Sequence, residues 1–278
     1  MTRNIAIVVG VLALIALAAL AFSVFRSPEE ASAPITAAPL TIETSAPVAA
    51  ATQPPAAEPT ATPESVAAPT ETAPAVEPTT APVEEPTATA EPTAEPVPAA
   101  APALFEIVQA ESQARFIIDE VLRGAPKRVV GVTDQVAGQI AIDPANPAAT
   151  QLGQIMVNAR TLATDNEFRN RAIRNQILDT NSFEFVTFQP AELVGLPAAV
   201  TVGQPFTFQV VGDLTIKDVT RPMTFDVTVT PVSETRIEGL ATITFPYRDF
   251  AVRIPQVPSV DLVADDVTLE LEFVAVAP

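Results

Sequence analysis

The sequence contains no cysteine and no histidine among its 278 residues. These absences exclude the Ser-His-Asp and Cys-His nucleophile systems and the usual ligands of zinc. The lack of cysteine also excludes a lipid-modified cysteine and a disulfide framework, and it is compatible with export from the cytoplasm. The sequence has no glycine-rich phosphate loop and no EF-hand pattern. Catalysis would therefore depend on carboxylates.

Two pairs of neighbouring acidic residues, Asp119-Glu120 and Asp265-Asp266, are the candidates for such chemistry. Neighbours on a strand point to opposite faces, so adjacency does not make them a matched acid and base. We interpret both pairs as solvated charges at turns or strand edges. The sequence therefore predicts no catalytic residue, no metal site and no cofactor, and it does not indicate an enzyme.

Basic side chains are missing from residues 27 to 102, which contain 17 Pro and 11 Glu but no Lys, Arg or Asp. A segment of Pro, Ala, Thr and Glu whose like charges repel cannot build a core, so we predict a disordered linker with polyproline II character. Its Thr-Pro content fits either a glycosylated stalk or a spacer of no particular chemistry.

Positive charge is also scarce in residues 103 to 278, which hold 22 acidic and 13 basic side chains. Binding to nucleic acid requires a basic surface that neutralises phosphates. The net charge of −9 therefore argues against a nucleic-acid partner for this part of the chain.

Charge is absent altogether from residues 5 to 25, a predominantly apolar run. At about 1.5 Å per residue, a helix of this length crosses the roughly 30 Å hydrocarbon layer. The run exceeds the usual signal-peptide core of about 7 to 15 residues, so we predict that residues 1 to 26 form a retained transmembrane anchor, although Ala19-Leu-Ala21 resembles a cleavage site. Arg3 favours a cytoplasmic N-terminus and an extracytoplasmic C-terminal domain, in the periplasm or at the cell surface.

Residues 103 to 278 are numerous enough for one domain with a sizeable core, and their pattern is β throughout. Phe206, Phe208 and Val210 occupy every second position, which is the period of a strand. Lys217-Asp218 supplies turn residues, and Pro222 opens the next alternating run, so we predict an antiparallel hairpin. Strands are expected at about 105–109, 115–122, 128–133, 135–143, 154–161, 183–194, 206–216, 222–231, 236–245 and 267–275.

One short amphipathic helix is predicted at residues 165 to 178, with Thr164 or Asp165 as the N-cap and Phe168 and Ile173 on the apolar face. Many short strands with a single helix indicate either a closed barrel or a sandwich. Composition does not decide between these two architectures.

The predicted hairpin also carries a motif, because Gly212-Asp-Leu-Thr-Ile-Lys-Asp-Val-Thr-Arg-Pro222 resembles the G-x-L-T-I-x-G-V-T-R/K-P hairpin of the YceI-like family. Arg169 and Arg174 resemble the arginines of that family's R-D-x-H-L-R helix. Residues 247 to 252 resemble its x-R-x-D-F-G-I motif, one residue short. The resemblance extends over residues 105 to 276.

The sequence departs from the family pattern at four positions. Asp218 stands where the hairpin motif has Gly, and Ala251 stands where the later motif has Gly. Asn170 and Ala172 replace the Asp and His of the helix motif. A polar contact that the family makes through that His is therefore not expected in this chain.

The resemblance implies an extended, antiparallel, eight-stranded lipocalin-like β-barrel with a long internal tunnel, and a ligand of the isoprenoid, quinone or polyprenyl type. The phenylalanines of the alternating faces form either a plain core or the wall of such a tunnel. The lipid-binding candidates are Phe116, Phe168, Ile173, Ile177, Phe183, Phe188, Phe208, Phe225 and Phe245. The candidates for a polar or anionic head group are Arg160, Arg169, Arg174 and Arg248, which could alternatively form ion pairs with nearby carboxylates.

Two functions are consistent with these patterns. The first is a membrane-tethered, extracytoplasmic, lipid-binding protein whose residues 103 to 278 form the binding domain. The second is a surface-displayed β domain that binds protein or glycan and holds no internal ligand. An apolar cavity along the domain would favour the first, and a filled core with an exposed apolar patch would favour the second.

Overall fold

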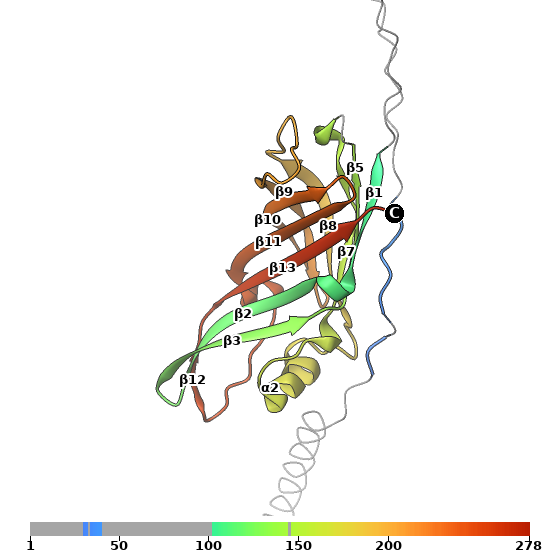
Figure 1. Cartoon of the computed structure of the whole chain (residues 1–278). Coiled ribbons are helices and arrows are strands. Elements are labelled where there is room, and N and C mark those ends of the chain that lie inside the picture. The colour runs from blue at the N-terminus through green and yellow to red at the C-terminus, as the bar shows by residue number, and fades with distance from the viewer. Residues whose placement is uncertain (1–29, 33, 41–101, 144–145) are drawn as a thin grey trace, which may run out of the picture. The chain divides into compact units, whose positions relative to one another are not determined.

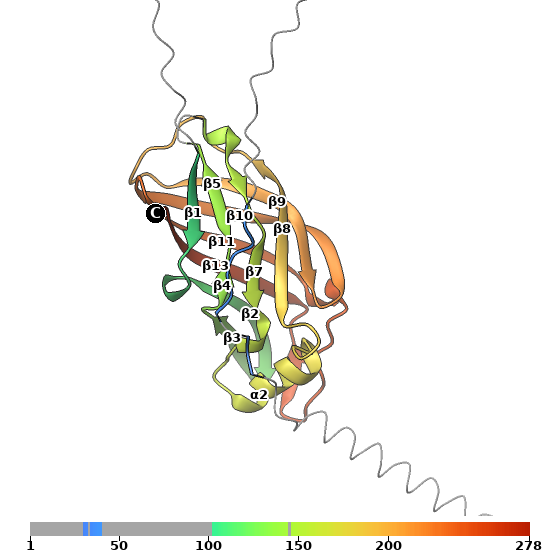
Figure 2. The ribbon, with the colours of Figure 1, turned by 90° about the vertical axis from the view of Figure 1, so that its right-hand side faces the viewer.

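The computed structural model describes residues 30–32, 34–40, 102–143 and 146–278. The predicted membrane run at residues 5 to 25 and most of the predicted linker lie outside the described residues. Within the described ranges, no helix is both long enough and apolar enough to cross a membrane. The strands form one curled antiparallel sheet around an interior (Figures 1 and 2). The prediction of an all-β domain with one short helix is confirmed.

The sheet contains thirteen strands in the described part of the chain. Their bounds are β1 (Ala103–Ile107), β2 (Gln113–Leu122), β3 (Ala125–Thr133), β4 (Val136–Ala137), β5 (Gln139–Ile142), β6 (Gln151–Leu152), β7 (Ile155–Asn158), β8 (Phe185–Val194), β9 (Phe206–Ile216), β10 (Val219–Ser233), β11 (Arg236–Pro246), β12 (Val260–Val263) and β13 (Asp266–Val276). The helical elements are the 3₁₀ turns η1 (Gln109–Glu111), η2 (Pro147–Ala149), η3 (Ala159–Thr161) and η5 (Tyr247–Phe250), the helix α2 (Glu167–Ala172) and the π-helical turn η4 (Ile173–Ile177).

Short interruptions divide several of these strands, so the sheet is built from eight consecutive segments. The segments are β1 with β2, β3 with β4 and β5, β6 with β7, and then β8, β9, β10, β11 and β13, while β12 adds to the edge of β2. Each segment pairs antiparallel with the next one along the chain. The last strand, β13, pairs back with both β1 and β2. The sheet therefore closes on itself, which leaves one enclosed face.

The predicted hairpin joins β9 to β10 through a two-residue turn. Lys217 has a φ of 59°, so the left-handed conformation falls on this residue and not on Asp218. The prediction that the second strand starts at Pro222 is wrong, because pairing resumes directly after the turn, at Val219. Pro222 is tolerated there because the first part of β10, as far as Phe225, pairs with β9 alone and leaves its other edge open.

Gly212 of the hairpin motif is required by the close approach of β8. A side chain there would collide with the Gln189 carbonyl oxygen, the Phe188 ring and the Pro190 backbone. The ring of Phe188 instead occupies the space beside the glycine and points to the enclosed face. The motif glycine thus allows a large aromatic side chain to face the interior.

The predicted helix begins later than expected. Asn166 is the N-cap, since its side chain accepts a hydrogen bond of 3.1 Å from the Arg169 amide, so the assignment of this role to Thr164 or Asp165 is wrong. The Thr164 side chain instead donates to Asn170. Because both Asp165 and Asn166 can act as caps, the pattern alone could not distinguish them.

Two further differences from the predicted strands concern β8 and β12. β8 starts at Phe185 because the Phe183 amide donates to the Asp179 carbonyl within a turn. β12 was not predicted, and its four residues extend the edge of β2 by pairing with the part that ends at Leu122. A strand this short has too few alternating positions to be recognised in a sequence.

Residues 30–32 and 34–40, here called the docked segment, run along the outside of the barrel beside β4 and β7 (Figure 2). Ile35 and Ala37 are buried against Ala137, Met156 and Phe185, while Thr36 and Ala38 between and beyond them are exposed. The predicted linker starts at residue 27, so its composition predicts a spacer where these described residues pack on the domain.

Hydrogen bonds fix the docked segment at both ends. The Ser32 amide and hydroxyl donate to the two carboxylate oxygens of Glu184 at 2.8 Å each, and the Leu40 amide donates to Gln139 at 2.8 Å. Between them, the Gln109 side chain donates to the Ile35 carbonyl. Burial raises the pKa of Glu184, but the hydrogen bonds from Ser32 and Asn158 outweigh it and hold that pKa below its ordinary value.

The substitution Ile35→Asp is expected to release the docked segment. Burial of an isoleucine contributes about 1.5–3 kcal/mol, so its loss predicts an increase of roughly ten- to hundredfold in amide hydrogen exchange for residues 34 to 40. Exchange measured by mass spectrometry on peptides of the full chain checks this. The control is Thr36→Asp, at the neighbouring exposed position, which should exchange like the parent chain. Equal exchange in the two variants would contradict the packing described here.

Candidate functional site

The enclosed face of the barrel surrounds a cavity of about 1110 Å³. Pockets for small ligands usually measure about 300–1,000 Å³, so this cavity is large for a domain of this size. Its wall comes from every long strand and from α2, η4 and η5. Most of the side chains are aliphatic or aromatic, so the cavity suits an apolar ligand of considerable length.

Strand alternation explains why the wall is apolar. On β9, Phe206, Phe208 and Val210 line the cavity, and the alternation continues beyond Gly212 to Leu214 and Ile216. The partner strand β10 contributes its own alternate residues, Phe225, Val227 and Val229. The intervening threonines and charged residues face outward. The hairpin predicted from the sequence thus forms one section of the wall.

Aromatic rings occur in contacting pairs in the barrel. Phe188 and Phe225 meet edge to face with their centroids 4.9 Å apart, and Phe206 and Phe208 stack at 5.8 Å. The ring centroid of Phe245 lies 5.1 Å from that of Phe250, a completely buried residue of η5. Such pairs hold the rings in defined positions and so give the cavity a fixed shape.

Eight of the nine residues predicted to bind lipid line the cavity. Phe183 does not, because it lies in the turn before β8. Phe185, the next residue of the same parity, faces the docked segment on the outer side of the barrel. The eight that line the cavity are Phe116, Phe168, Ile173, Ile177, Phe188, Phe208, Phe225 and Phe245.

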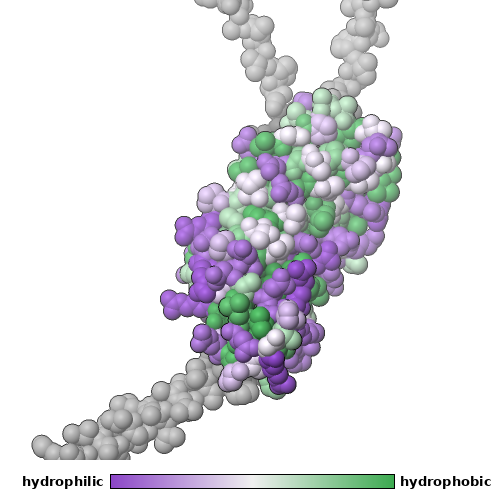
Figure 3. Space-filling view, turned by 90° about the vertical axis from the view of Figure 1, so that its left-hand side faces the viewer, coloured by the Kyte–Doolittle hydropathy of each residue, from purple (hydrophilic) through white to green (hydrophobic). Residues whose placement is uncertain are grey.

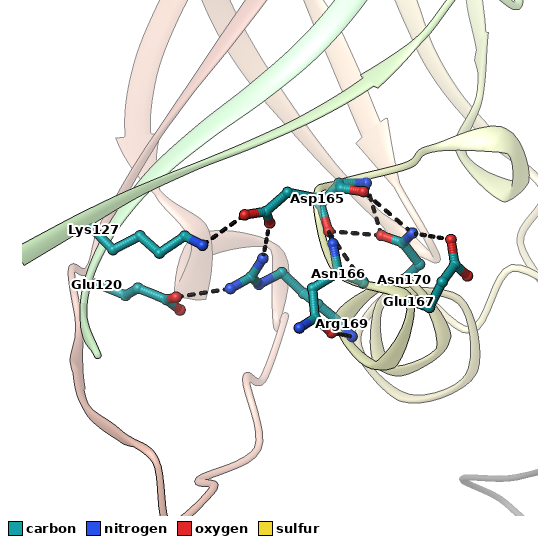
Figure 4. A network of polar contacts seen from close by, with 8 residues as sticks. Glu120, Lys127, Asp165, Asn166, Glu167, Arg169 and Asn170 are labelled. Carbon is teal, nitrogen blue, oxygen red and sulfur yellow. Dashed lines mark hydrogen bonds and ion pairs between the residues drawn. The ribbon is translucent and has the colours of Figure 1, made fainter. Parts of the chain in front are cut away.

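Polar residues line the cavity mainly near the two ends of the barrel. At one end they are Ser233, the last residue of β10, and Glu234 and Thr235 of the turn to β11. At the other end they come from β2, β3 and α2, and here they form the connected network of Figure 4. We call this second end the α2 end.

The network at the α2 end alternates positive and negative groups. Arg169 donates to Glu120 at 2.8 Å and to Asp165 at 2.6 Å, and Lys127 donates to Asp165 at 2.6 Å (Figure 4). The hydrogen bond from Lys127 lowers the pKa of Asp165 below its ordinary value, and Arg169 acts in the same direction. Two cations, Lys127 and Arg169, thus face two carboxylates, Glu120 and Asp165, so these four side chains together carry no net charge.

Asn170, which stands where the family motif has Asp, stabilises the helix that supplies Arg169 to this network. It is buried, accepts hydrogen bonds from the Thr164 amide and hydroxyl at 2.7 Å each, and donates to Glu167 at 3.1 Å. These contacts tie α2 to the loop before it. The position of Arg169 at the cavity therefore depends on a neutral amide in this chain.

Of the four arginines predicted to contact a head group, Arg169 lines the cavity and the other three do not. Arg160 is buried outside the cavity, where it donates to the Thr180 carbonyl and forms an ion pair of 3.3 Å with Glu184. Arg248 is exposed and pairs with Asp265 at 2.9 Å. Arg174 follows α2 on the turn η4.

Two residues at the α2 end were missed by the sequence analysis. The interpretation of Asp119-Glu120 as solvated charges is correct for Asp119, which pairs with Arg128 on the outside, but wrong for Glu120. Glu120 is only 9% exposed and lines the cavity. The alternation that places Ala114, Phe116 and Ile118 inside extends to Glu120 and could have located it. Lys127, at the start of β3, carried no such signal.

Comparisons with known proteins agree with this architecture. The chain resembles the solved polyisoprenoid binding domain from Saccharophagus degradans with a TM-score of 0.50 and 16% sequence identity, over 63% of this chain and 98% of that domain. It also resembles BcnA of Burkholderia cenocepacia, with a TM-score of 0.49 and 19% identity over 60% and 98% of the two chains. No curated protein matches the chain.

The match to a protein family is more extensive. The family model of the YceI-like domain matches residues 105–275, which is more than half of the chain and includes β2 to β12, the last three residues of β1 and all but the last residue of β13. The hairpin motif and the helix α2 with Arg169 lie within the matched residues. The chain therefore belongs to the YceI-like domain family.

Proposed function

We propose that the barrel of residues 103 to 278 binds a long apolar lipid of the isoprenoid type in its cavity. The observation that carries the proposal is the apolar cavity of about 1110 Å³ along the enclosed face of the sheet. A folded domain normally fills its interior with side chains at high packing density. A large apolar space inside the barrel therefore supports a role in ligand binding, and its lining by residues from both ends of the barrel favours an elongated ligand.

The class of ligand is suggested by a relative. The solved domain from Saccharophagus degradans is described as polyisoprenoid binding, and the cavity of this chain fits the same class. Phenylalanines and branched aliphatic residues contact a methyl-branched chain without needing a polar group from it. The eight cavity-lining candidates from Phe116 to Phe245 are the proposed contacts for that chain.

The head group proposed for this lipid is uncharged or weakly polar, as in a quinone. Arg169 and Lys127 are already matched by Glu120 and Asp165 at short distances. A diphosphate would add two or more negative charges beside carboxylates that offset the cations, whereas a carbonyl or hydroxyl needs only a single hydrogen bond. A polyprenyl phosphate is the alternative that the same experiment distinguishes.

The proposed location is the extracytoplasmic side of the cytoplasmic membrane, with residues 5 to 25 as the anchor. The uncharged run and the basic N-terminus support this orientation. We propose no enzymatic role, since the chain contains no histidine or cysteine. The alternative of a surface domain without an internal ligand is disfavoured by the volume of the cavity.

Lipid bound to the full chain is expected to be recovered by organic extraction. The chain would be expressed in its membrane-bound form, purified in mild detergent and extracted, and the extract analysed by mass spectrometry. We expect a neutral isoprenoid lipid at about one molecule per protein, because one cavity of this volume holds one long chain. Recovery of polyprenyl phosphates instead would contradict the uncharged head group, and extracts without enriched lipid would contradict the proposed function.

The substitution Ala241→Trp is expected to reduce the recovered lipid severalfold. Ala241 lies in the middle of β11, opposite Val227 and Leu271, and faces the cavity. An indole there takes up space that the ligand needs, and the open cavity can accept it without overpacking the core. Leu240→Trp is the matched control, because Leu240 is the neighbouring residue and points outward. Equal lipid recovery from both variants would show that the cavity is not the site.

A further inference from the structure

Large apolar side chains are exposed at the α2 end of the cavity. Phe168 on α2 is 74% exposed, Leu262 on β12 is 64% exposed and Val257 before β12 is 45% exposed. Phe168 and Val257 also line the cavity. Two contacts place these residues at the same end of the barrel. Arg169 of α2 donates a hydrogen bond to Glu120 of β2, and β12 pairs with β2 at the same residue.

This end also carries exposed charges of both signs. Arg123 and Arg171 are exposed there, as are Asp261 and Glu167. Figure 3 shows apolar side chains among hydrophilic ones at the lower end of the molecule, where Figure 1 places α2 and β12. Since the charges oppose each other, the apolar side chains and not a net charge distinguish this surface.

The docked segment fixes the start of the described chain at the same end. The Glu30 carbonyl accepts a hydrogen bond of 2.9 Å from Arg160, and Ser32 is held by Glu184. Arg160 in turn donates to Thr180, which follows the turn η4 after α2. Glu30 is therefore attached to the part of the barrel that carries the helix.

Chain length then limits the distance from the membrane. The uncharged run ends at residue 25, five residues before Glu30. Five residues span at most roughly 18 Å when fully extended. The polar headgroup layer on each side of a bilayer is about 5–8 Å thick, so Glu30 cannot lie far above it. The docked segment thus allows little separation between this end of the barrel and the bilayer.

We propose that the α2 end of the barrel docks on the lipid surface in which residues 5 to 25 are anchored, with Phe168, Leu262 and Val257 in the headgroup region. The lipid then enters and leaves the cavity at this end, directly from the bilayer. The proposal depends on the proposed function for the membrane anchor and for the ligand. Residues 41 to 101 come after the docked segment in the sequence, so they do not separate the anchor from the barrel.

The opposite end of the cavity is the competing surface. Val200, Val202 and Val232 are exposed there and two of them, Val200 and Val202, line the cavity. An eleven-residue strand such as β13 is roughly 35 Å long, so the two ends are well separated. The attachment of Glu30 near α2 holds the opposite end away from the bilayer.

Single tryptophans can distinguish the two ends, because the natural sequence contains no Trp. Phe168→Trp and Leu262→Trp report on the α2 end, and Val202→Trp and Val232→Trp report on the opposite end. Each full-length variant is reconstituted into phosphatidylcholine vesicles with or without bromine on the upper acyl chain. Circular dichroism and co-flotation verify folding and membrane association. All four positions are exposed, so the substitutions leave the core intact.

We expect brominated lipid to quench Phe168→Trp and Leu262→Trp by about twofold or more, since an interfacial apolar side chain lies about 5–10 Å deep, at the boundary of the acyl chains. Val202→Trp and Val232→Trp should keep their emission. Adding Ile35→Asp to the Phe168→Trp chain should remove the quenching while the protein still floats with the vesicles. Adding Thr36→Asp instead should leave the quenching unchanged.

Quenching at Val202→Trp but not at Phe168→Trp would overturn the proposed orientation. Vesicle-bound chains that show no quenching at either end would also overturn it, since the barrel would then be held off the surface. A chain that does not float with the vesicles would also overturn the proposal, because residues 5 to 25 would then not anchor it in the bilayer. Lipid extraction distinguishes these failures from failure of the proposed function, because bound lipid without quenching leaves the binding function intact.

Discussion

Closure of the sheet is the constraint on which the rest of this structure depends. Because β13 pairs with β1 and β2, the sheet closes on itself and one of its faces surrounds the cavity. Most of the side chains on that face, at every second position of a strand, are apolar. The same alternation that stabilises the barrel also makes its cavity apolar, so stability and ligand binding draw on one set of residues.

The two ends of the cavity differ in their polar groups and in their distance from the start of the docked segment. At the α2 end, Arg169 and Glu120 add a balanced polar network to the apolar wall, and Asn170 holds the helix that supplies Arg169. The docked segment attaches the chain near this end through Ser32 and Glu184. A polar rim, an exposed Phe168 and the attachment point of the N-terminal chain therefore occur together, which is the arrangement expected of an entrance.

Sequence periodicity predicted the fold well where alternation is long, as from Phe206 to Ile216, and failed where local patterns were ambiguous. The burial of Glu120 was not predicted, because its charge and its neighbour Asp119 suggested a solvated pair. The alternation of β2, however, places Glu120 on the inner face. The docked segment was not predicted, because its two buried residues, Ile35 and Ala37, stand in a Pro- and Ala-rich composition. Their partner Phe185 lies about 150 residues away, and contacts at such separation leave no local signal.

The central claim is that the cavity holds one long apolar lipid, and a density map of the full chain purified with its lipid tests this most directly. The account predicts a continuous tube of density along the barrel, passing Phe188 and Phe225 and ending beside Arg169. A cavity filled by repacked side chains or by ordered water in place of such a tube would contradict the account.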